Sequence, residues 1–331
     1  MDNVDIHKEF LRTLHERYPK KSDLVNTVSG LLRVEKDVVY RRLSGRVAFS
    51  AQEIGRIAQA LNISLDALIH TAKDTLRLPF LMEYPLKVRS MEELYTIIEE
   101  SDNKLNSGGM PAVTGNIYNT LPMEFFLYFP VLTKYMLFRW GYHFVGSEEF
   151  NNFSAWQPPE KINHLRNKIE ERYTFEKCYY IWDEALMWNM CREIANFNRM
   201  RIISDKEKTE IAGDLKEFLY QFERMMNGTY LPDLFANVKE TSFYVSSMHL
   251  GFNAVYLSSV QKNYAVFHTN FSFSMIEDDP ALFDPVRQWI DSFKNVSTQL
   301  SDSGRMERRL FFDTQYKVID HILQLSDASI Y

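Results

Sequence analysis

The chain has 331 residues, of which 45% are hydrophobic and 14% aromatic, and its formal net charge is −6. This length allows a small module and a larger body, and the hydrophobic content excludes a largely disordered chain. The net charge excludes a protein that coats nucleic acid with its whole surface. Residues 1–75 nevertheless carry 12 Lys and Arg against 10 Asp and Glu, while the remainder carries 26 against 34. We therefore expect a locally basic module attached to an acidic body.

The beginning of the chain predicts several short helices in succession. Residues 5–18 carry apolar side chains at helical spacing, and Pro19 ends this helix because a residue before proline avoids the helical region. Ser22 is expected to cap the second helix. Ser50 and Glu53 have the spacing of a capping box, which predicts the start of a later helix.

Two helices joined by a tight turn are predicted at the centre of this module. Apolar residues follow helical spacing on both, with Val28, Leu31 and Leu32 on the first and Val38, Val39 and Leu43 on the second. The break at residues 33–35 is so short that the helices must cross steeply, as in a helix-turn-helix. From Arg33 to Arg56 there are six basic residues against three acidic ones. The outer face of the second helix is therefore expected to reach bases and phosphates in a DNA major groove.

These residues resemble the helix-turn-helix regulators of the phage-repressor and LacI type. The matching positions are the small residue where the helices touch, the turn valine, the buried valine, the arginine and the closing glycine, which here are Ser29, Val34, Val39, Arg41 and Gly45. Residues 49–68 resemble the fourth and fifth helices of the repressor-type domain. The resemblance implies an all-helical, five-helix module over residues 1–74 that binds double-stranded DNA.

Two residues depart from the pattern of that family. Arg33 stands where glycine is usual, so we expect the turn to take a geometry that does not need glycine. Glu35 stands where Ser or Thr usually caps the recognition helix. Its charge suits a helix N-terminus, but a carboxylate on the longer Glu side chain caps less well.

Eight residues are predicted to form the DNA-binding surface, and they are Ser22, Arg33, Lys36, Asp37, Tyr40, Arg41, Arg42 and Arg46. Lys36 and Arg41 are expected to reach base edges or phosphates, and Tyr40 a thymine methyl group or a phosphate. Arg42 and Arg46 are expected to neutralise backbone phosphates. Ser22 is expected to anchor a phosphate through its hydroxyl and the backbone N–H groups of the helix start.

Residues 75–331 are predicted to form a mainly helical body with a small antiparallel sheet, which makes the chain mainly α and α+β overall. Expected helices cover residues 91–100, 125–142, three segments between 159 and 226, 280–293 and a last stretch to Leu325, and expected strands cover 242–245, 253–257 and 264–273. Residues 101–111 are predicted as a loop that serves as a hinge or a ligand lid. Residues 40–43, 125–130 and 311–312 resemble an uncharacterised group of Bacteroidetes regulators with a large C-terminal body, which implies regulator architecture.

The aromatic side chains of the body allow two interpretations. The first is core packing, because seven of them recur on helix faces, namely Phe125, Phe129, Tyr135, Phe138, Trp182, Trp188 and Phe197. The second is a pocket for a small-molecule effector, with Met187, Met190 and Met200 as adaptable walls. The predicted strands either close one side of such a pocket or pair edge to edge in a dimer.

No spacing in the sequence indicates catalysis. Cys178 and Cys191 are expected to be reduced thiols in the core, and the histidines and acidic residues show no metal-ligand or catalytic spacing. We therefore predict no enzyme activity and no cofactor. The acidic N-terminus lacks an apolar signal sequence, and residues 125–145 are too charged to span a membrane. These features predict a cytoplasmic protein without a membrane partner.

The sequence thus predicts a sequence-specific DNA-binding transcriptional regulator that acts as a homodimer. One module alone buries too little surface for tight specific binding, so two copies about one DNA turn apart are expected. The alternative is an interaction protein that keeps the repressor-like module as a docking domain without DNA binding. The polar and aromatic face formed by Asp37 and Tyr40 favours DNA readout over a protein-binding groove.

Overall fold

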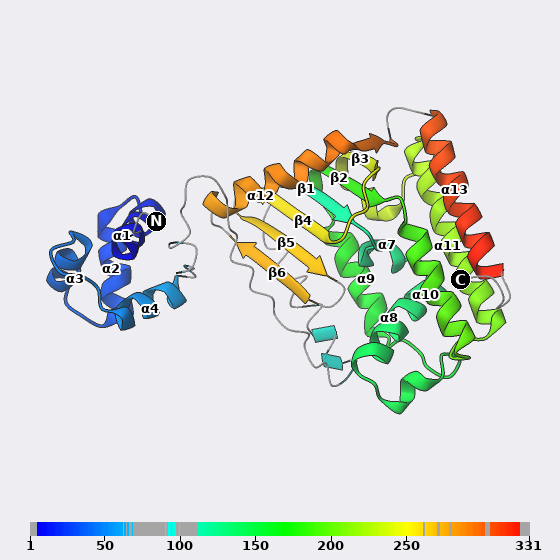
Figure 1. The fold of residues 1–331 in the computed structure, drawn as a ribbon, viewed down its shortest axis with the longest axis horizontal. Helices are drawn as coiled ribbons and strands as arrows, with labels where there is room; N and C mark the ends of the chain where they lie inside the picture. The colour runs from blue at the N-terminus through cyan, green and yellow to red at the C-terminus, as the bar shows by residue number, and fades with distance from the viewer. Residues whose placement is uncertain are drawn as a thin grey trace. The chain divides into compact units, whose positions relative to one another are not determined.

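The computed structural model describes residues 5–61, 112–260, 262–269, 272–277, 280–301 and 305–324, together with isolated positions between 63 and 99. The chain forms two compact units, Met1–Leu81 and Met82–Tyr331 (Figure 1). The predicted boundary after residue 74 and the predicted loop at 101–111 lie outside the described residues. Most of the predicted fifth helix and half of the predicted helix at 91–100 do so as well.

The N-terminal unit is helical throughout its described elements, which are α1 (Ile6–Arg17), α2 (Lys21–Leu32), α3 (Lys36–Leu43) and α4 (Ala51–Ala60). Their apolar faces share one core that includes Phe10, Val28, Val39 and Ile57. The predicted capping box is confirmed, because the Ser50 hydroxyl accepts from the Glu53 N–H and the Glu53 carboxylate accepts from the Ser50 N–H.

The start of α2 differs from the prediction. Lys20 is the residue that precedes the helix, and no side chain caps it. Ser22 lies in the first turn instead, exposed, with its hydroxyl 3.3 Å from the carboxylate of Asp23. The prediction of Ser22 as the cap is wrong because the helix begins at Lys21, one residue before Ser22.

The second unit contains a seven-stranded sheet in the order β6-β5-β4-β1-β2-β3-β7. The strands are β1 (Ala112–Tyr118), β2 (Phe175–Asp183), β3 (Val238–Ser246), β4 (Asn253–Ser259), β5 (Asn263–Thr269), β6 (Ser272–Glu277) and β7 (Ser297–Gln299). The pairs β1–β2 and β2–β3 are parallel, and the remaining pairs are antiparallel. The predicted small antiparallel sheet is therefore wrong, and the unit is an α+β fold built on a large mixed sheet.

The error has a physical reason in β1 and β2. Residues 178–183 of β2 are all buried, and most of β1 is buried too, because layers of structure cover both faces of these strands. Such strands lack the polar-apolar alternation of a half-exposed strand and cannot be told from a buried helix by periodicity. The segment 175–183 was accordingly predicted as helix. Of the predicted meander, the antiparallel pairing of 253–257 with 264–269 is confirmed as β4 and β5. The strand at 242–245 is part of β3, which pairs with β2 and not with β4, and the predicted strand at 264–273 is divided into β5 and β6.

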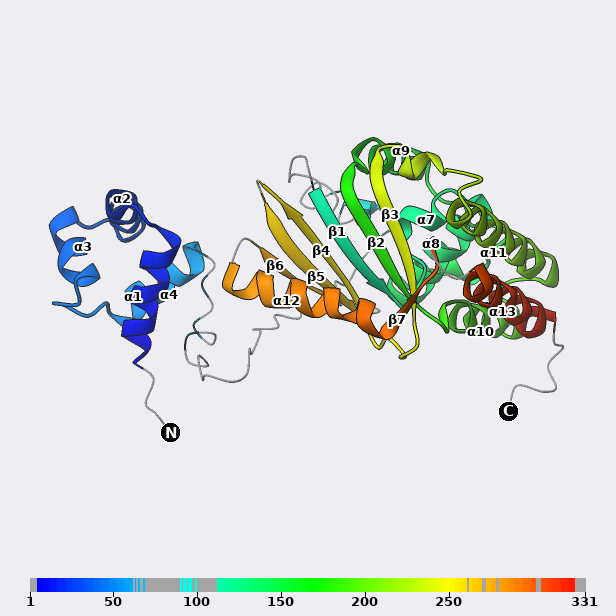
Figure 2. The ribbon, with the colours of Figure 1, turned by 90° about the horizontal axis from the view of Figure 1, so that it is seen from above.

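The helices of this unit connect and cover the strands. They are α7 (Met123–Phe126), α8 (Pro130–Phe144), α9 (Lys161–Arg172), α10 (Leu186–Arg199), α11 (Asp205–Met226), α12 (Pro280–Ser292) and α13 (Arg305–Gln324), with 3₁₀ helices at Glu148–Asn151, Asp233–Phe235 and Phe293–Val296. The helix α12 packs against β1, β4 and β5, and α13 packs against α10 and α11. Figures 1 and 2 show α12 on one face of the sheet and α8, α10 and α11 beyond the other.

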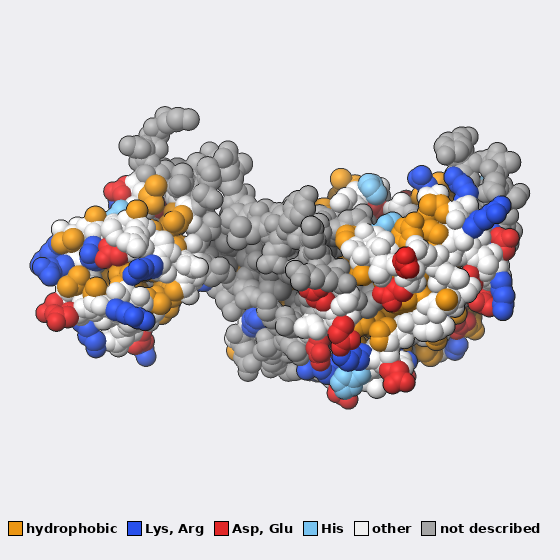
Figure 3. Space-filling view, turned by 90° about the horizontal axis from the view of Figure 1, so that it is seen from below, with side chains coloured by type: hydrophobic (Ala, Val, Ile, Leu, Met, Phe, Trp, Pro, Cys, Tyr) orange, Lys and Arg blue, Asp and Glu red, His pale blue; other side chains and the backbone are white. Residues whose placement is uncertain are grey.

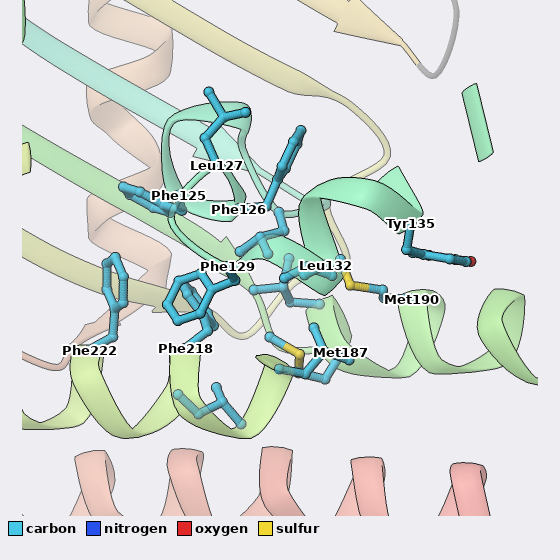
Figure 4. Packing of buried hydrophobic residues seen from close by; sticks show 14 of the residues in the cluster. Phe125, Phe126, Leu127, Phe129, Leu132, Tyr135, Met187, Met190, Phe218 and Phe222 are labelled. Carbon is cyan, nitrogen blue, oxygen red and sulfur yellow. The ribbon is translucent and has the colours of Figure 1, made fainter. Parts of the chain in front are cut away.

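Aromatic side chains fill the layer between the sheet and the helices. The ring centroid of Phe125 lies 4.7 Å from that of Phe222 (Figure 4) and 4.8 Å from that of Tyr180. Trp182 is fully buried, with its ring centroid 5.7 Å from that of Phe222. The core-packing interpretation is confirmed for six of its seven residues, while Trp188 is 43% exposed. Met187 and Met190 are buried, but Met200 is 53% exposed and is not part of an enclosed wall.

The two cysteines are free and buried, as predicted. Burial raises the pKa of the Cys191 thiol to about 12 and that of Cys178 well above its ordinary value. A thiol with a raised pKa is a poor nucleophile. Within the described residues, no helix combines the length and the apolar character that a membrane crossing requires.

Glu124 gives the second unit a predictable pH dependence. Burial raises the pKa of its carboxyl from 4.5 to about 7, against a hydrogen bond from the Tyr180 hydroxyl (3.3 Å) that lowers it. Because the raised pKa belongs to the folded state, this group contributes stability below about pH 4.5 that is lost as the pH rises through 7. We expect Glu124→Gln to flatten the fall in the denaturation midpoint between about pH 5 and 8, measured by tryptophan fluorescence. Equal pH profiles of variant and wild type would contradict this assignment.

Candidate nucleic-acid interface

The turn between α2 and α3 is closed by hydrogen bonds of its own residues. The Ser29 hydroxyl donates to the carbonyl of Val34 (2.6 Å), and the Val34 N–H donates to the carbonyl of Ser29 (3.3 Å). Between them Arg33 adopts the left-handed conformation, with φ 56° and ψ 46°. The expectation that arginine would change the turn geometry is therefore wrong, because the closing bonds hold Arg33 in a conformation that glycine favours.

This conformation predicts that Arg33→Gly stabilises the module. A left-handed non-glycine residue costs about 1 kcal/mol, and glycine removes that cost. The matched variant Arg33→Ala deletes the same charge but keeps the strain. Hydrogen exchange of the α2 and α3 amides in the full chain should therefore slow in the Gly variant relative to the Ala variant. Equal exchange in the two variants would show that the backbone strain at this turn is negligible.

The ends of α3 are set by Glu35 and Gly45. Glu35 precedes the helix without a side-chain capping bond, as its residue type predicts. At the other end Gly45 has φ +73°, its N–H donates to the Arg42 carbonyl (2.9 Å), and the Arg46 N–H donates to the Arg41 carbonyl (3.1 Å). This pair of bonds is a Schellman motif. It ends the helix at Leu43, one residue after Arg42, and leaves Arg46 exposed just beyond it.

Arg42 does not lie on the outer face with the other basic residues. One guanidinium nitrogen lies 2.8 Å from the carboxylate of Glu53 and another donates to the Ala48 carbonyl (2.6 Å), while the group lies over the ring of Phe49. Both charged side chains are less than one fifth exposed. Arg42 therefore links α3 to the start of α4, and little of its guanidinium group remains free to contact a phosphate.

The outer face of α3 presents Lys36, Asp37, Tyr40 and Arg41, all exposed. Tyr40 is 42% exposed, and the ammonium of Lys21 lies 5.6 Å from the centroid of its ring. This cation–π contact places the first turn of α2 beside the middle of α3. Lys21 was not among the predicted contacts, although the basic pair Lys20-Lys21 at a helix start was a signal for it.

The charge of this surface is mixed. Figure 3 shows Lys and Arg side chains at several places on the visible face of the N-terminal unit, with acidic side chains between them. Asp23, Glu35 and Asp37 are exposed on the same elements as Lys21, Lys36 and Arg41. Arg33 is exposed at the turn and Ser22 at the start of α2. The surface therefore offers separate cationic contact points and not a continuous positive field.

Comparison of the chain with protein-family models, with curated proteins and with solved structures found no match. Among the residues that the structure describes, no three His, Cys, Asp or Glu side chains are grouped so that they could hold a metal ion. The candidate interface in the N-terminal unit is therefore defined by the geometry of its residues alone. It is a pair of short helices joined by a three-residue turn, with basic and aromatic side chains on the exposed face of the second helix.

Proposed function

We propose that the protein is a sequence-specific DNA-binding regulator of transcription that acts as a homodimer. The observation that carries the proposal is the exposed face of α3, which joins Lys36, Tyr40 and Arg41 to Lys21 at the start of α2. A helix of this kind fits a major groove, with its first turns at the base edges and the preceding helix across the phosphate backbone. Such a regulator would work in the cytoplasm, in contact with the chromosome.

The side chains divide into two groups of contacts. Lys36 and Arg41 would read base edges, and Tyr40 would contact a thymine methyl group or a phosphate. Lys21 lies beside Tyr40, Arg33 and Arg46 flank α3 in the sequence, and these exposed side chains would neutralise phosphates. The backbone N–H groups at the uncapped start of α2, with the Ser22 hydroxyl, would bind a further phosphate. Arg42 would act as a positioning residue, since its contacts hold α3 against α4.

Two copies of the module are required for tight binding, because one such module buries too little surface. A dimer would place two α3 helices in successive major grooves about 34 Å apart. The sheet-containing unit, the larger of the two, would supply that association.

A protein-docking module is the second candidate. The carboxylates of Asp23, Glu35 and Asp37 favour it, because they would lie near DNA phosphates and weaken binding. Salt dependence separates the two candidates. The intact protein should bind a mixed-sequence duplex with an affinity that falls by roughly three to five powers of ten between about 50 and 200 mM salt. Binding that is absent at low salt, or independent of salt, would favour the docking module.

A further inference from the structure

A cleft in the second unit lies at the carboxyl ends of the parallel strands. Asn119 and Thr120 follow the end of β1, Asp183 ends β2, and α10 begins directly after it. The segment 247–252 connects β3 to β4. Because β2 and β1 lie between these two strands in the sheet, the segment passes the ends of both. The cleft between them has a volume of about 360 Å³ and also includes Arg139 and Glu193. In open sheets of this kind, ligands bind outside the carboxyl ends of the strands.

A histidine in the wall of this cleft is held by a buried carboxylate. The Nδ1 atom of His249 lies 2.9 Å from Oδ2 of Asp183, and the His249 side chain is 70% exposed while that of Asp183 is 2% exposed. Asp183 also accepts the N–H groups of Ala185 (2.7 Å) and Leu250 (2.6 Å). A carboxylate fixed in this way orients the imidazole and leaves Nε2 as its second hydrogen-bonding atom.

The charged groups of the cleft are already paired. The guanidinium of Arg139 lies 3.0 Å from the carboxylate of Glu193, which also lies 3.5 Å from Nε2 of His143. Asp183 has its three donors. Arg139 and Glu193 therefore neutralise each other within the described lining, which attracts neither an anion nor a cation by net charge.

The rest of the lining is uncharged. The Asn119 amide nitrogen donates to the Leu250 carbonyl (2.8 Å), but the Asn119 Oδ1 atom is buried without a hydrogen-bond partner. This atom is closed off from solvent, so it is not a contact point for a ligand in the cleft. Thr120 and Asn189 add neutral polar groups to the lining, and Leu186 and Met190 add apolar surface.

We propose that this cleft binds an uncharged, polyhydroxylated small molecule of about monosaccharide size. One of its hydroxyl groups donates to His249 Nε2, others exchange hydrogen bonds with Thr120 and Asn189, and its C–H surface packs on Leu186 and Met190. The volume of the cleft suits a small ligand of this kind. The inference does not depend on DNA binding, because every residue that carries it belongs to the unit Met82–Tyr331.

Calorimetric titration of the full chain tests this site. The neutral probes are glucose, galactose, xylose, arabinose and inositol, and the charged counterparts are glucose 6-phosphate and glucuronate. At least one neutral probe should bind, and about tenfold or more tighter than the charged counterparts. Absence of binding by every neutral probe to the folded protein, or tighter binding of a charged one, would overturn the proposal.

Three variants locate the binding to the cleft. His249→Ala and Asn189→Ala should each weaken binding of the neutral probe, by about tenfold for His249, which loses a hydrogen bond to the ligand. Asn189 is exposed, so its replacement leaves the fold intact even if loss of His249 disturbs Asp183. Asn196→Ala, an exposed asparagine farther along α10 and outside the cleft, is the matched control and should bind as the wild type does. Unchanged affinity in both cleft variants would overturn the assignment.

Discussion

Gly115→Ala is expected to destabilise the sheet-containing unit by about 3 kcal/mol. A Cβ atom at Gly115 of β1 would lie 2.3 Å from the hydroxyl oxygen of Tyr179 and 2.4 Å from a ring carbon of Tyr256. Both hydroxyls donate to the carboxylate of Asp291 at the end of α12, at 2.8 and 3.1 Å. The added methyl group would displace the two rings and with them the anchor of α12 on the sheet. Overpacking and loss of bonds to a charged acceptor each cost about 1 to 3 kcal/mol.

Gly213→Ala on α11 is the matched control for that substitution. A Cβ atom at Gly213 would have no other atom within 4 Å, and the residue lies in the middle of α11 on its solvent-exposed side. Alanine there should stabilise the unit by up to about 1 kcal/mol. All five tryptophans of the chain lie in the second unit, so denaturant unfolding followed by their fluorescence reports on it alone. Equal stability of the two variants would show that β1 relaxes around the new methyl group.

Arg41→Ala is expected to weaken DNA binding by about 10- to 100-fold while leaving the module folded. Arg41 is exposed on α3, and a base or phosphate contact by arginine is worth about 1 to 3 kcal/mol. Fluorescence anisotropy with a labelled duplex measures the loss. Arg12→Ala is the control of equal charge, because Arg12 is a surface residue of α1 paired with Glu9 and Glu16. An equal loss in both variants would mean that only the net charge of the unit matters.

Arg42→Ala should behave differently from its neighbour. Its removal leaves Glu53 without its cation and the Ala48 carbonyl without a donor, so the module itself should lose stability. Hydrogen exchange in α3 and α4 would then accelerate, whereas Arg41→Ala would leave it unchanged. The two adjacent arginines thus allow the proposed DNA contact to be tested separately from the positioning of α3.

Local signals made the N-terminal helices predictable. Pro19, the Ser50–Glu53 capping box and Gly45 each act within a few residues, so sequence alone locates the elements around them. The left-handed conformation of Arg33 was not predictable from its residue type, because the bonds between Ser29 and Val34 outweigh its conformational cost. The bracing role of Arg42 depended on a contact with Glu53 on the next helix, which helical spacing does not indicate.

The second unit was less predictable because its elements depend on long-range contacts. The strand β2 is buried on both faces and shows no alternation, so its apolar run was assigned to a helix. The cleft joins Asn119, which follows β1, and His249, which lies between β3 and β4, while Asp183 at the end of β2 holds His249 in place. No local motif links these residues. Only the order of the strands brings them to one edge.

Selection of binding sites from a randomised duplex pool by the intact protein tests the proposed function most directly. A dimeric regulator should enrich a palindromic motif whose half-sites lie about one DNA turn apart, and Arg41→Ala should lose that enrichment. A folded wild-type protein that enriches no motif at low salt would contradict the account. The exposed face of α3 would then be a surface for protein docking.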